Sequence, residues 1–87
     1  MALSDDFAAA QAKVKTLSKT PDASELLELY ALFKQGTVGD VTGERPGMLD
    51  FKGRAKYDAW AAKRGGSKDS SMQSYVALVE KLATKYG

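Results

Sequence analysis

The sequence contains no cysteine and no histidine among its 87 residues. Without cysteine there can be no disulfide and no thiolate metal site, which is typical of a cytosolic protein. Without histidine the chain lacks the imidazole on which Ser-His-Asp and Cys-His catalytic systems depend. Carboxylates are present, but their spacing singles out no catalytic pair. We therefore expect no catalytic residue, no metal site and no cofactor.

Long hydrophobic runs and an excess of charge are also missing. The net charge is only +2, whereas a protein that binds nucleic acid through bulk charge is normally more basic. No apolar run approaches the length of a membrane span, and residues 1–6 lack the features of a signal peptide. We expect a cytoplasmic protein that binds no nucleic acid and does not insert stably into membranes.

The length and the hydrophobic content of 44% suit one small domain, residues 1–87, with a modest core. Apolar residues at helical spacing predict four helices. The first carries the stripe Phe7, Ala10, Val14 and Leu17 and begins at Ser4 or Asp5. The second and third span 23–35 and 51–64, and Asp22 and Asp50 are their expected N-caps. The fourth follows Ser67 and carries the stripe Met72, Tyr75, Val76, Val79, Leu82, Ala83 and Tyr86. This pattern indicates an all-α bundle.

The middle of the second predicted helix is hydrophobic on almost every face. Residues 26–33 read Leu-Leu-Glu-Leu-Tyr-Ala-Leu-Phe. Neighbouring helices in a small bundle cover only part of such a surface, so the remainder must be overpacked, exposed or covered by a ligand.

One long segment, residues 36–50, has neither helical nor strand periodicity and is rich in glycine. A loop of this length in a small domain is uncommon and is often functional. We expect an ordered loop whose apolar end, Met48, Leu49 and Phe51, packs into the core.

Tyr30, Phe33 and Lys34 form the most informative cluster. Tyr30 and Lys34 are four residues apart, so they share one face of the helix. An aromatic ring beside an ammonium group suits a ligand with both a flat base and a phosphate. The same spacing also fits core aromatics followed by a lysine whose stem covers them. From the pattern alone, Lys56 and Tyr75 carry the same two interpretations.

Two other motifs are weak. Gly65-Gly66-Ser67-Lys68 lacks the residue order of a phosphate-binding loop, and no strand precedes it. Lys13, Lys15 and Lys19 lie near acidic residues and are not followed by interleaved aromatics, so they do not indicate a nucleic-acid surface.

Three blocks of sequence together go beyond these patterns. They are Leu29-Tyr30-Ala31-Leu32-Phe33-Lys34-Gln35-Gly36-Thr37-Val38-Gly39-Asp40, Arg45-Pro46-Gly47-Met48-Leu49-Asp50 and Lys56-Tyr57-Asp58-Ala59-Trp60. In content, spacing and total length the chain resembles the acyl-CoA-binding protein family from Phe7 to Tyr86. The resemblance implies a four-helix up-down-down-up bundle with one long ordered loop between helices 2 and 3. It also implies non-enzymatic binding, buffering and intracellular transport of medium- to long-chain acyl-CoA esters.

The resemblance also assigns roles to matching residues. The residues that it implies as contacts to the 3′-phosphate of the adenosine are Tyr30, Lys34 and Lys56. The rings facing adenine are Phe33 and Tyr75, while Lys15 is a peripheral contact and Leu27 lines the acyl groove. Two positions differ from the family's usual pattern: Phe33 replaces a tyrosine, and Tyr57 replaces a common tryptophan, which leaves Trp60 as the only tryptophan.

As a member of such a family the chain is expected to be a monomer that makes transient contact with acyl-CoA-using enzymes or membranes. A second interpretation is a protein-interaction module that holds an amphipathic helix on the apolar face of its second helix. A third, an enzyme acting on CoA thioesters, lacks a nucleophile with an adjacent base.

Overall fold

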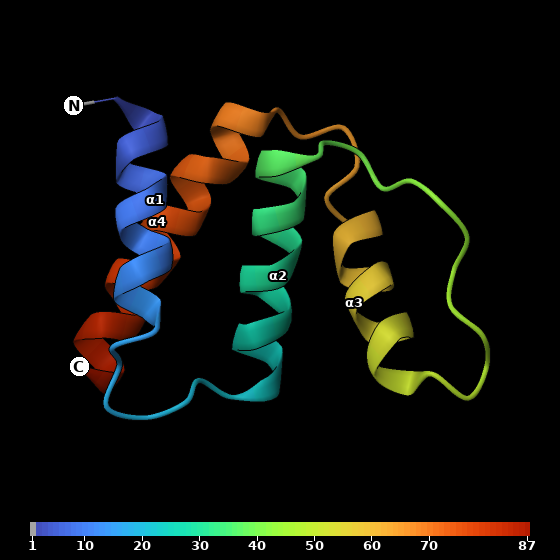
Figure 1. Cartoon of the computed structure of the whole chain (residues 1–87), viewed down its shortest axis with the longest axis horizontal. Helices are drawn as coiled ribbons and strands as arrows, with labels where there is room; N and C mark the ends of the chain where they lie inside the picture. Colours follow the sequence, from blue (N-terminus) through green and yellow to red (C-terminus); the bar gives the residue numbers. More distant parts are fainter. Residues whose placement is uncertain (1) are drawn as a thin grey trace.

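The computed structural model describes residues 2–87, so Met1, the first residue of the segment judged not to be a signal peptide, lies outside the described residues. The secondary structure of this part consists of four helices: α1 (Leu3–Val14), α2 (Ala23–Thr37), α3 (Phe51–Ala61) and α4 (Lys68–Tyr86). α1 and α4 run in one direction and α2 and α3 in the other (Figure 1). The predicted all-α, up-down-down-up bundle is confirmed.

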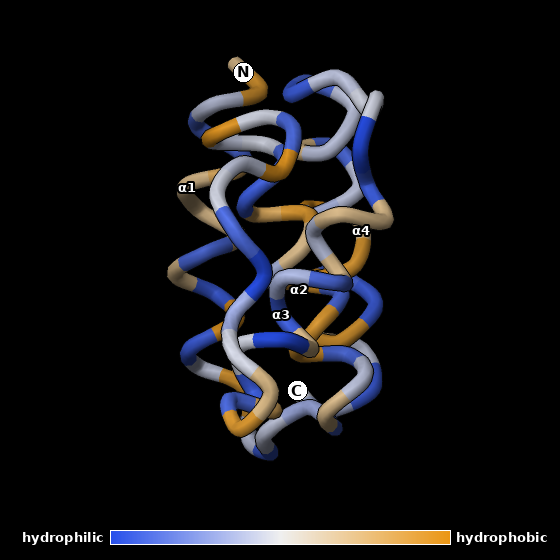
Figure 2. The backbone as a smooth tube through the Cα atoms, turned by 90° about the vertical axis from the view of Figure 1, so that its right-hand side faces the viewer, coloured by the Kyte–Doolittle hydropathy of each residue, from blue (hydrophilic) through white to orange (hydrophobic). Residues whose placement is uncertain are grey.

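α2 lies at the centre of the arrangement, with α4 packed on one side and α3 on the other, while α1 packs on α4. Hydrophobic and hydrophilic residues are interspersed along the chain (Figure 2), and α1, α2 and α4 each bury an apolar face. The buried core joins α1, α2 and α4 and consists of Phe7, Ala10, Leu29, Leu32, Tyr75, Val79 and Leu82. α3 stands outside this cluster and contributes one buried side chain of its own, Trp60.

Three of the four helix starts follow the prediction. Asp22 and Glu25 form a complete capping box at α2. The side chains of Asp50 and Ser67 accept hydrogen bonds from backbone N–H groups in the first turns of α3 and α4. These bonds satisfy donors that a helix start otherwise leaves without a partner.

The start of α1 was predicted wrongly. The helix begins at Leu3, and its N-cap is Ala2, which makes no side-chain capping bond. Ser4 therefore lies inside the helix, and Asp5 in its first turn, where a negative charge still favours the helix dipole. A suitable capping residue at one position does not prevent the helix from extending further.

Two helix ends also differ from the prediction. α2 continues to Thr37, two residues beyond the expected end, and α3 ends at Ala61 rather than at residue 64. After Ala61 the backbone forms turns as far as Gly65. Gly65 has a positive φ of 91°, a conformation that residues with a side chain rarely adopt. Leu17 lies beyond the end of α1 but still packs against the core.

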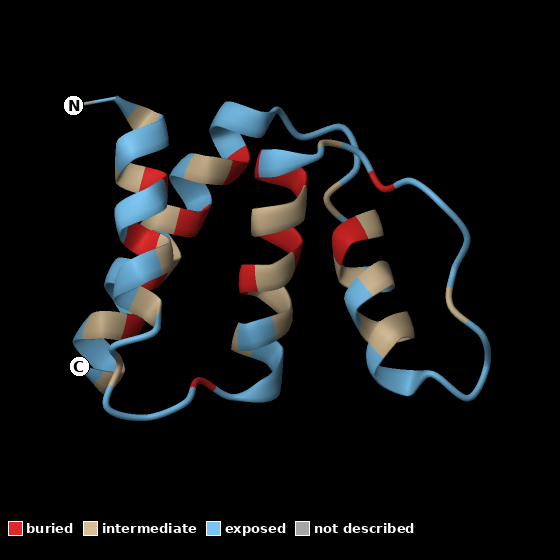
Figure 3. Cartoon of the chain, viewed as in Figure 1, coloured by how far each residue is buried: buried red, intermediate tan, exposed pale blue. Residues whose placement is uncertain are grey.

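The loop between α2 and α3 lies on the surface. Met48, Leu49 and Phe51 were expected in the core, but their exposed fractions are 75%, 90% and 74%, so that prediction is wrong. We call these three residues the apolar tip. All residues from Gly47 to Lys52 are exposed (Figure 3).

Polar contacts to α3 explain why the tip faces outwards. The indole Nε1 of Trp60 donates to the carbonyl of Gly39 at 2.8 Å, and the hydroxyl of Tyr57 donates to the carbonyl of Gly43 at 3.0 Å. The loop is thus fastened along α3 by hydrogen bonds from α3 side chains, which do not require burial of its apolar end. The expectation of an ordered loop agrees with these bonds.

Glu25 joins the start of α2 to the end of α4. Its carboxylate accepts a hydrogen bond from the Tyr86 hydroxyl at 2.6 Å and pairs with the Lys85 ammonium at 3.0 Å. The bond from Tyr86, followed by bonds from Asp22 and Lys85, lowers the pKa of Glu25. Such a depressed carboxyl pKa stabilises the fold above the ordinary glutamate pKa of about 4.3, and this stabilisation is lost as the pH falls through the folded-state value.

We therefore expect Glu25→Gln to lower the melting temperature by a few degrees at neutral pH. The difference from the parent should shrink as the pH falls below the ordinary glutamate range, because the parent's carboxylate then becomes neutral too. Thermal unfolding followed by circular dichroism across pH measures this. Glu80→Gln, at an exposed position of α4, is the control. A Glu25→Gln deficit that does not change with pH would contradict the electrostatic explanation.

Candidate functional site

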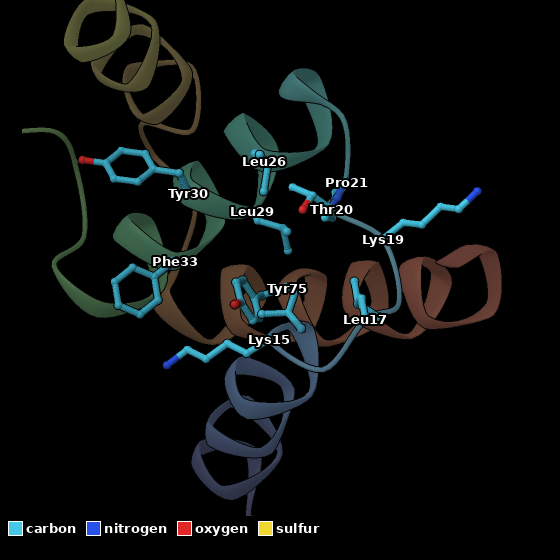
Figure 4. Close-up of a pocket in the computed structure, with 11 residues that line it drawn as sticks. Lys15, Leu17, Lys19, Thr20, Pro21, Leu26, Leu29, Tyr30, Phe33 and Tyr75 are labelled. Atoms are coloured by element: carbon cyan, nitrogen blue, oxygen red, sulfur yellow. The ribbon is translucent and has the colours of Figure 1, made fainter. Parts of the chain in front are cut away.

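A cavity of about 570 Å³ lies beside the segment that connects α1 to α2, and we call it the connector cavity. Its walls come from the end of α1, this connector, α2 and one residue of α4. They are Val14, Lys15, Leu17, Lys19, Thr20, Pro21, Leu26, Leu29, Tyr30, Phe33 and Tyr75 (Figure 4). Lys15 extends towards Phe33, whereas Lys19 extends in the opposite direction (Figure 4).

Aromatic rings form one wall of the connector cavity. The ring centroids of Phe33 and Tyr75 are 6.5 Å apart, and each ring also contacts Phe7, at 6.0 and 5.0 Å. Phe7 holds both rings in place from the core, and the half-buried Phe33 offers a free surface to the cavity. Rings positioned in this way suit a flat aromatic ligand.

Tyr75 is only 5% exposed, and burial raises the pKa of its hydroxyl. Within residues 2–87 this hydroxyl has no hydrogen-bond partner, although the side chain lines the connector cavity. A neutral hydroxyl in this position can donate to a polar group that enters the cavity.

A second hollow of about 370 Å³ lies between α2 and α3, and we call it the α2–α3 groove. Its lining is mainly aliphatic and aromatic, with two lysines from α3: Ala23, Leu26, Leu27, Tyr30, Lys52, Ala55 and Lys56. Leu26 and Tyr30 line both hollows, so the connector cavity and the groove meet across α2. One ligand with a polar, flat part and an apolar part could therefore occupy both.

Two lysines lie over aromatic rings near this junction. The ammonium of Lys56 is 5.5 Å from the centre of the Tyr30 ring, and that of Lys34 is 4.9 Å from the centre of the Trp60 ring. Cation–π contacts at partly exposed sites are weak, about 0.5–1 kcal/mol. Neither lysine forms an ion pair with any described residue. Both are therefore available to an anion that competes with the rings.

Within residues 2–87 no cluster of acidic side chains has the arrangement of a metal site. None of the described helices is both long enough and hydrophobic enough to cross a bilayer. Further hollows lie along α1 and α4, away from the residues that the sequence predicted to contact a ligand.

The sequence model of the family described as "Acyl CoA binding protein" matches residues 4–79. The chain belongs to this acyl-CoA-binding protein family. This confirms the resemblance inferred from the three sequence blocks, and the match includes residues of all four helices and ends within α4. The family is a family of binding proteins.

Two named relatives are similar to this chain. Acyl-CoA-binding protein homolog 1 of Caenorhabditis elegans is 60% identical over 87 residues, which is 100% of this chain and 99% of the relative. The acyl-CoA-binding protein homolog of Drosophila melanogaster is 49% identical over 84 residues, 97% of this chain and 98% of the relative. Both relatives therefore match the chain over its whole length or nearly so.

Solved structures of the family share the same fold. The crystal structure of Oryza sativa acyl-CoA-binding protein 2 superposes with a TM-score of 0.92 at 42% identity, covering 97% of this chain and 93% of the other. The crystal structure of the protein from Moniliophthora perniciosa superposes with a TM-score of 0.88 at 40% identity, covering 98% of this chain and 83% of the other.

The structure brings most of the predicted site residues to the two hollows. Lys15, Tyr30, Phe33 and Tyr75 line the connector cavity, and Leu27, Tyr30 and Lys56 line the α2–α3 groove. Lys34 lines neither hollow, because its ammonium lies over Trp60.

Sequence reasoning missed several residues of these walls as site residues, among them Leu26 and Lys52. Leu26 lines both hollows and is 44% exposed, and Lys52 lines the groove beside Lys56. Leu26 belongs to the over-apolar run of α2, and Lys52 precedes Lys56 by one helical turn. Both signals were in the sequence, but neither distinguishes a site residue from an ordinary surface residue.

Proposed function

We propose that this protein binds medium- to long-chain acyl-CoA esters without reacting with them. As a monomer formed by a single acyl-CoA-binding domain, it buffers these esters and carries them within the cytoplasm. The observation that carries the proposal is that two hollows adjoin at Leu26 and Tyr30. One has an aromatic wall formed by Phe33 and Tyr75, and the other is lined mainly by aliphatic side chains. An acyl-CoA ester has the matching division into a nucleotide head and an apolar chain.

The nucleotide head is assigned to the connector cavity. Phe33 and Tyr75 face the adenine, and Lys15 contacts the CoA from the rim. Tyr30, Lys34 and Lys56 hold the 3′-phosphate. Lys56 is already beside the Tyr30 ring, whereas Lys34 leaves the Trp60 ring to reach the same phosphate. A charge-assisted bond to phosphate is stronger than an exposed cation–π contact, which favours this exchange.

The acyl chain is assigned to the α2–α3 groove. Leu27 and Ala55 line it from opposite helices, and the small alanine side chain leaves room for the chain. A bound chain would cover the part of the α2 apolar surface that neighbouring helices leave open, including the half-exposed Leu26. This removes apolar surface from water on both the protein and the ligand.

The proposal that the protein does not react with its ligand can be tested separately. Neither hollow is lined by a nucleophile with an adjacent base, and the sequence has no histidine or cysteine. Palmitoyl-CoA incubated with the protein should be recovered intact, as measured by mass spectrometry of the thioester. Hydrolysis or acyl transfer faster than in buffer would contradict the proposal.

Phe33 gives a prediction that separates a ligand contact from a core residue. Because its ring lines the cavity, Phe33→Tyr should leave the melting temperature unchanged and acyl-CoA affinity equal or modestly higher. Phe33→Ala should cost about 1–3 kcal/mol of affinity, the range for stacking on a base. Calorimetry and thermal unfolding measure the two effects. If Phe33→Tyr instead melts several degrees lower with unaltered affinity, the edge of the ring is in the core.

Trp60 gives an optical prediction, since it is the only tryptophan and lies under the Lys34 ammonium. Binding of palmitoyl-CoA should change the tryptophan fluorescence as Lys34 moves to the phosphate. In Lys34→Met the change should be largely lost. Lys81→Met, on the exposed side of α4, should respond like the parent. An equal fluorescence change in Lys34→Met would show that Lys34 does not move on binding.

A further inference from the structure

The apolar tip lies next to the open end of the α2–α3 groove. The groove is lined by Ala23, the first residue of α2, and by Lys52, which directly follows Phe51 of the tip. The N-terminal ends of α2 and α3 lie at the same end of the bundle (Figure 1). The apolar lining of the groove and the apolar tip therefore adjoin.

The tip exposes more hydrophobic surface than folding explains. Met48, Leu49 and Phe51 are each at least 74% exposed within a stretch of four residues. Single exposed hydrophobic residues are common, but a contiguous group of large ones marks an interaction surface. The contacts that fix the loop are made by Gly39, Asp40, Gly43 and Arg45, which precede the tip.

Positive charge surrounds the tip. Residues 44–56 contain four cations, Arg45, Lys52, Arg54 and Lys56, against two anions, Glu44 and Asp50. The Asp50 carboxylate accepts a bond from the N–H of Gly53, and Arg45 is paired with Asp58. Lys52 and Lys56 form no ion pair with any residue from 2 to 87. An apolar insert flanked by free lysines matches a lipid surface with acidic headgroups, which attracts both components.

We propose that the apolar tip docks this protein onto bilayers that carry acidic phospholipids. Met48, Leu49 and Phe51 enter the boundary between headgroups and acyl chains, while Lys52 and Lys56 lie at the headgroups. In this orientation the groove faces the membrane. This part of the inference rests on the proposed function. Long acyl chains favour the bilayer because each buried methylene stabilises insertion. An acyl chain then passes between bilayer and groove with little exposure to water.

The test uses the full chain without ligand and vesicles of phosphatidylcholine, with or without phosphatidylserine. Sedimentation with vesicles measures the partition coefficient. We expect binding to the acidic vesicles, weakened at least tenfold in the double variant Met48→Ser/Leu49→Ser. Lys52→Gln should weaken binding to acidic vesicles about fivefold and leave binding to neutral vesicles unchanged. Val38→Ser removes a half-exposed apolar residue at the opposite end of α2 and should have no effect.

A second measurement distinguishes this proposal from the proposed function. Titration of the double variant with palmitoyl-CoA in the absence of vesicles should give the parent's affinity, whereas transfer of palmitoyl-CoA from acidic vesicles should slow at least tenfold. Membrane docking would be overturned if the parent did not bind acidic vesicles, or if the double variant bound them as well as the parent. It would also be overturned if the double variant lost as much affinity for palmitoyl-CoA in solution as it lost for vesicles. A fourth contrary result is a dimer in sedimentation velocity that the double variant abolishes. A chain that fails to bind palmitoyl-CoA but still docks through the tip would refute the proposed function alone.

Discussion

Affinity should rise about tenfold for every two carbons added to the acyl chain, from octanoyl-CoA until the groove is full, and then level off. The reason is the apolar lining of the α2–α3 groove, where burial of one methylene is worth about 0.8 kcal/mol. Two methylenes therefore give about 1.6 kcal/mol, slightly more than a factor of ten in the dissociation constant. Isothermal titration calorimetry over a series of acyl lengths measures the slope and the length at which it ends.

A variant that fills the groove tests which hollow holds the chain. Ala55→Phe places a ring between α2 and α3, so it should flatten the dependence on chain length while leaving the affinity for CoA itself nearly unchanged. Ala77→Phe, at an exposed position of α4, is the matched control. A slope that survives in Ala55→Phe would place the chain outside this groove.

Removal of the charge on Lys56 should weaken palmitoyl-CoA binding by about 1.5–3 kcal/mol, the range for a hydrogen bond to a charged group. Lys56→Met keeps most of the apolar stem that lines the groove and removes the ammonium. Lys34→Met should cost a similar amount, because both lysines are assigned to one phosphate. Calorimetry gives the affinities, and the melting temperatures should change little because Lys56 is exposed and Lys34 only half-buried.

Two controls connect this loss to the 3′-phosphate. Lys81→Met removes a charge from an exposed position on α4 and should change affinity little. Dephospho-CoA esters should bind the parent weakly and lose little further in Lys56→Met or Lys34→Met. If all three lysine variants have the same small effect, the phosphate lies elsewhere.

Features set by local rules could be predicted from the sequence. The spacing of apolar residues predicted four helices, and the capping residues Asp22, Asp50 and Ser67 predicted where three of them begin. Both depend on neighbours within one or two helical turns, so the surrounding fold changes them little. The family motif then supplied the order and direction of the helices, which local patterns alone do not determine.

The position of the apolar tip could not be predicted in the same way. Met48, Leu49 and Phe51 were expected to be buried because hydrophobic side chains usually are, yet they are exposed. Their position depends on long-range bonds, such as that from Trp60 to Gly39, 21 residues apart. A hydrophobic residue that serves an interaction and one that serves the core look the same in a sequence.

The location of Lys34 was also beyond the sequence. Its distance of four residues from Tyr30 correctly implied one face of α2, but the ammonium lies over Trp60 of α3 and lines neither hollow. A long, flexible side chain chooses among partners that only the packed helices bring within reach. The seven assigned site residues therefore stay a prediction until affinity is measured on variants.

The most direct test of the central claim is calorimetric titration of the unmodified chain with palmitoyl-CoA, free CoA and palmitate under identical conditions. The account predicts tight binding of palmitoyl-CoA with one ligand per chain, and much weaker binding of CoA and of palmitate. In this account each of these fragments would fill only one of the two hollows that adjoin at Leu26 and Tyr30. Affinity for either fragment equal to that for palmitoyl-CoA, or no heat of binding for palmitoyl-CoA, would contradict it.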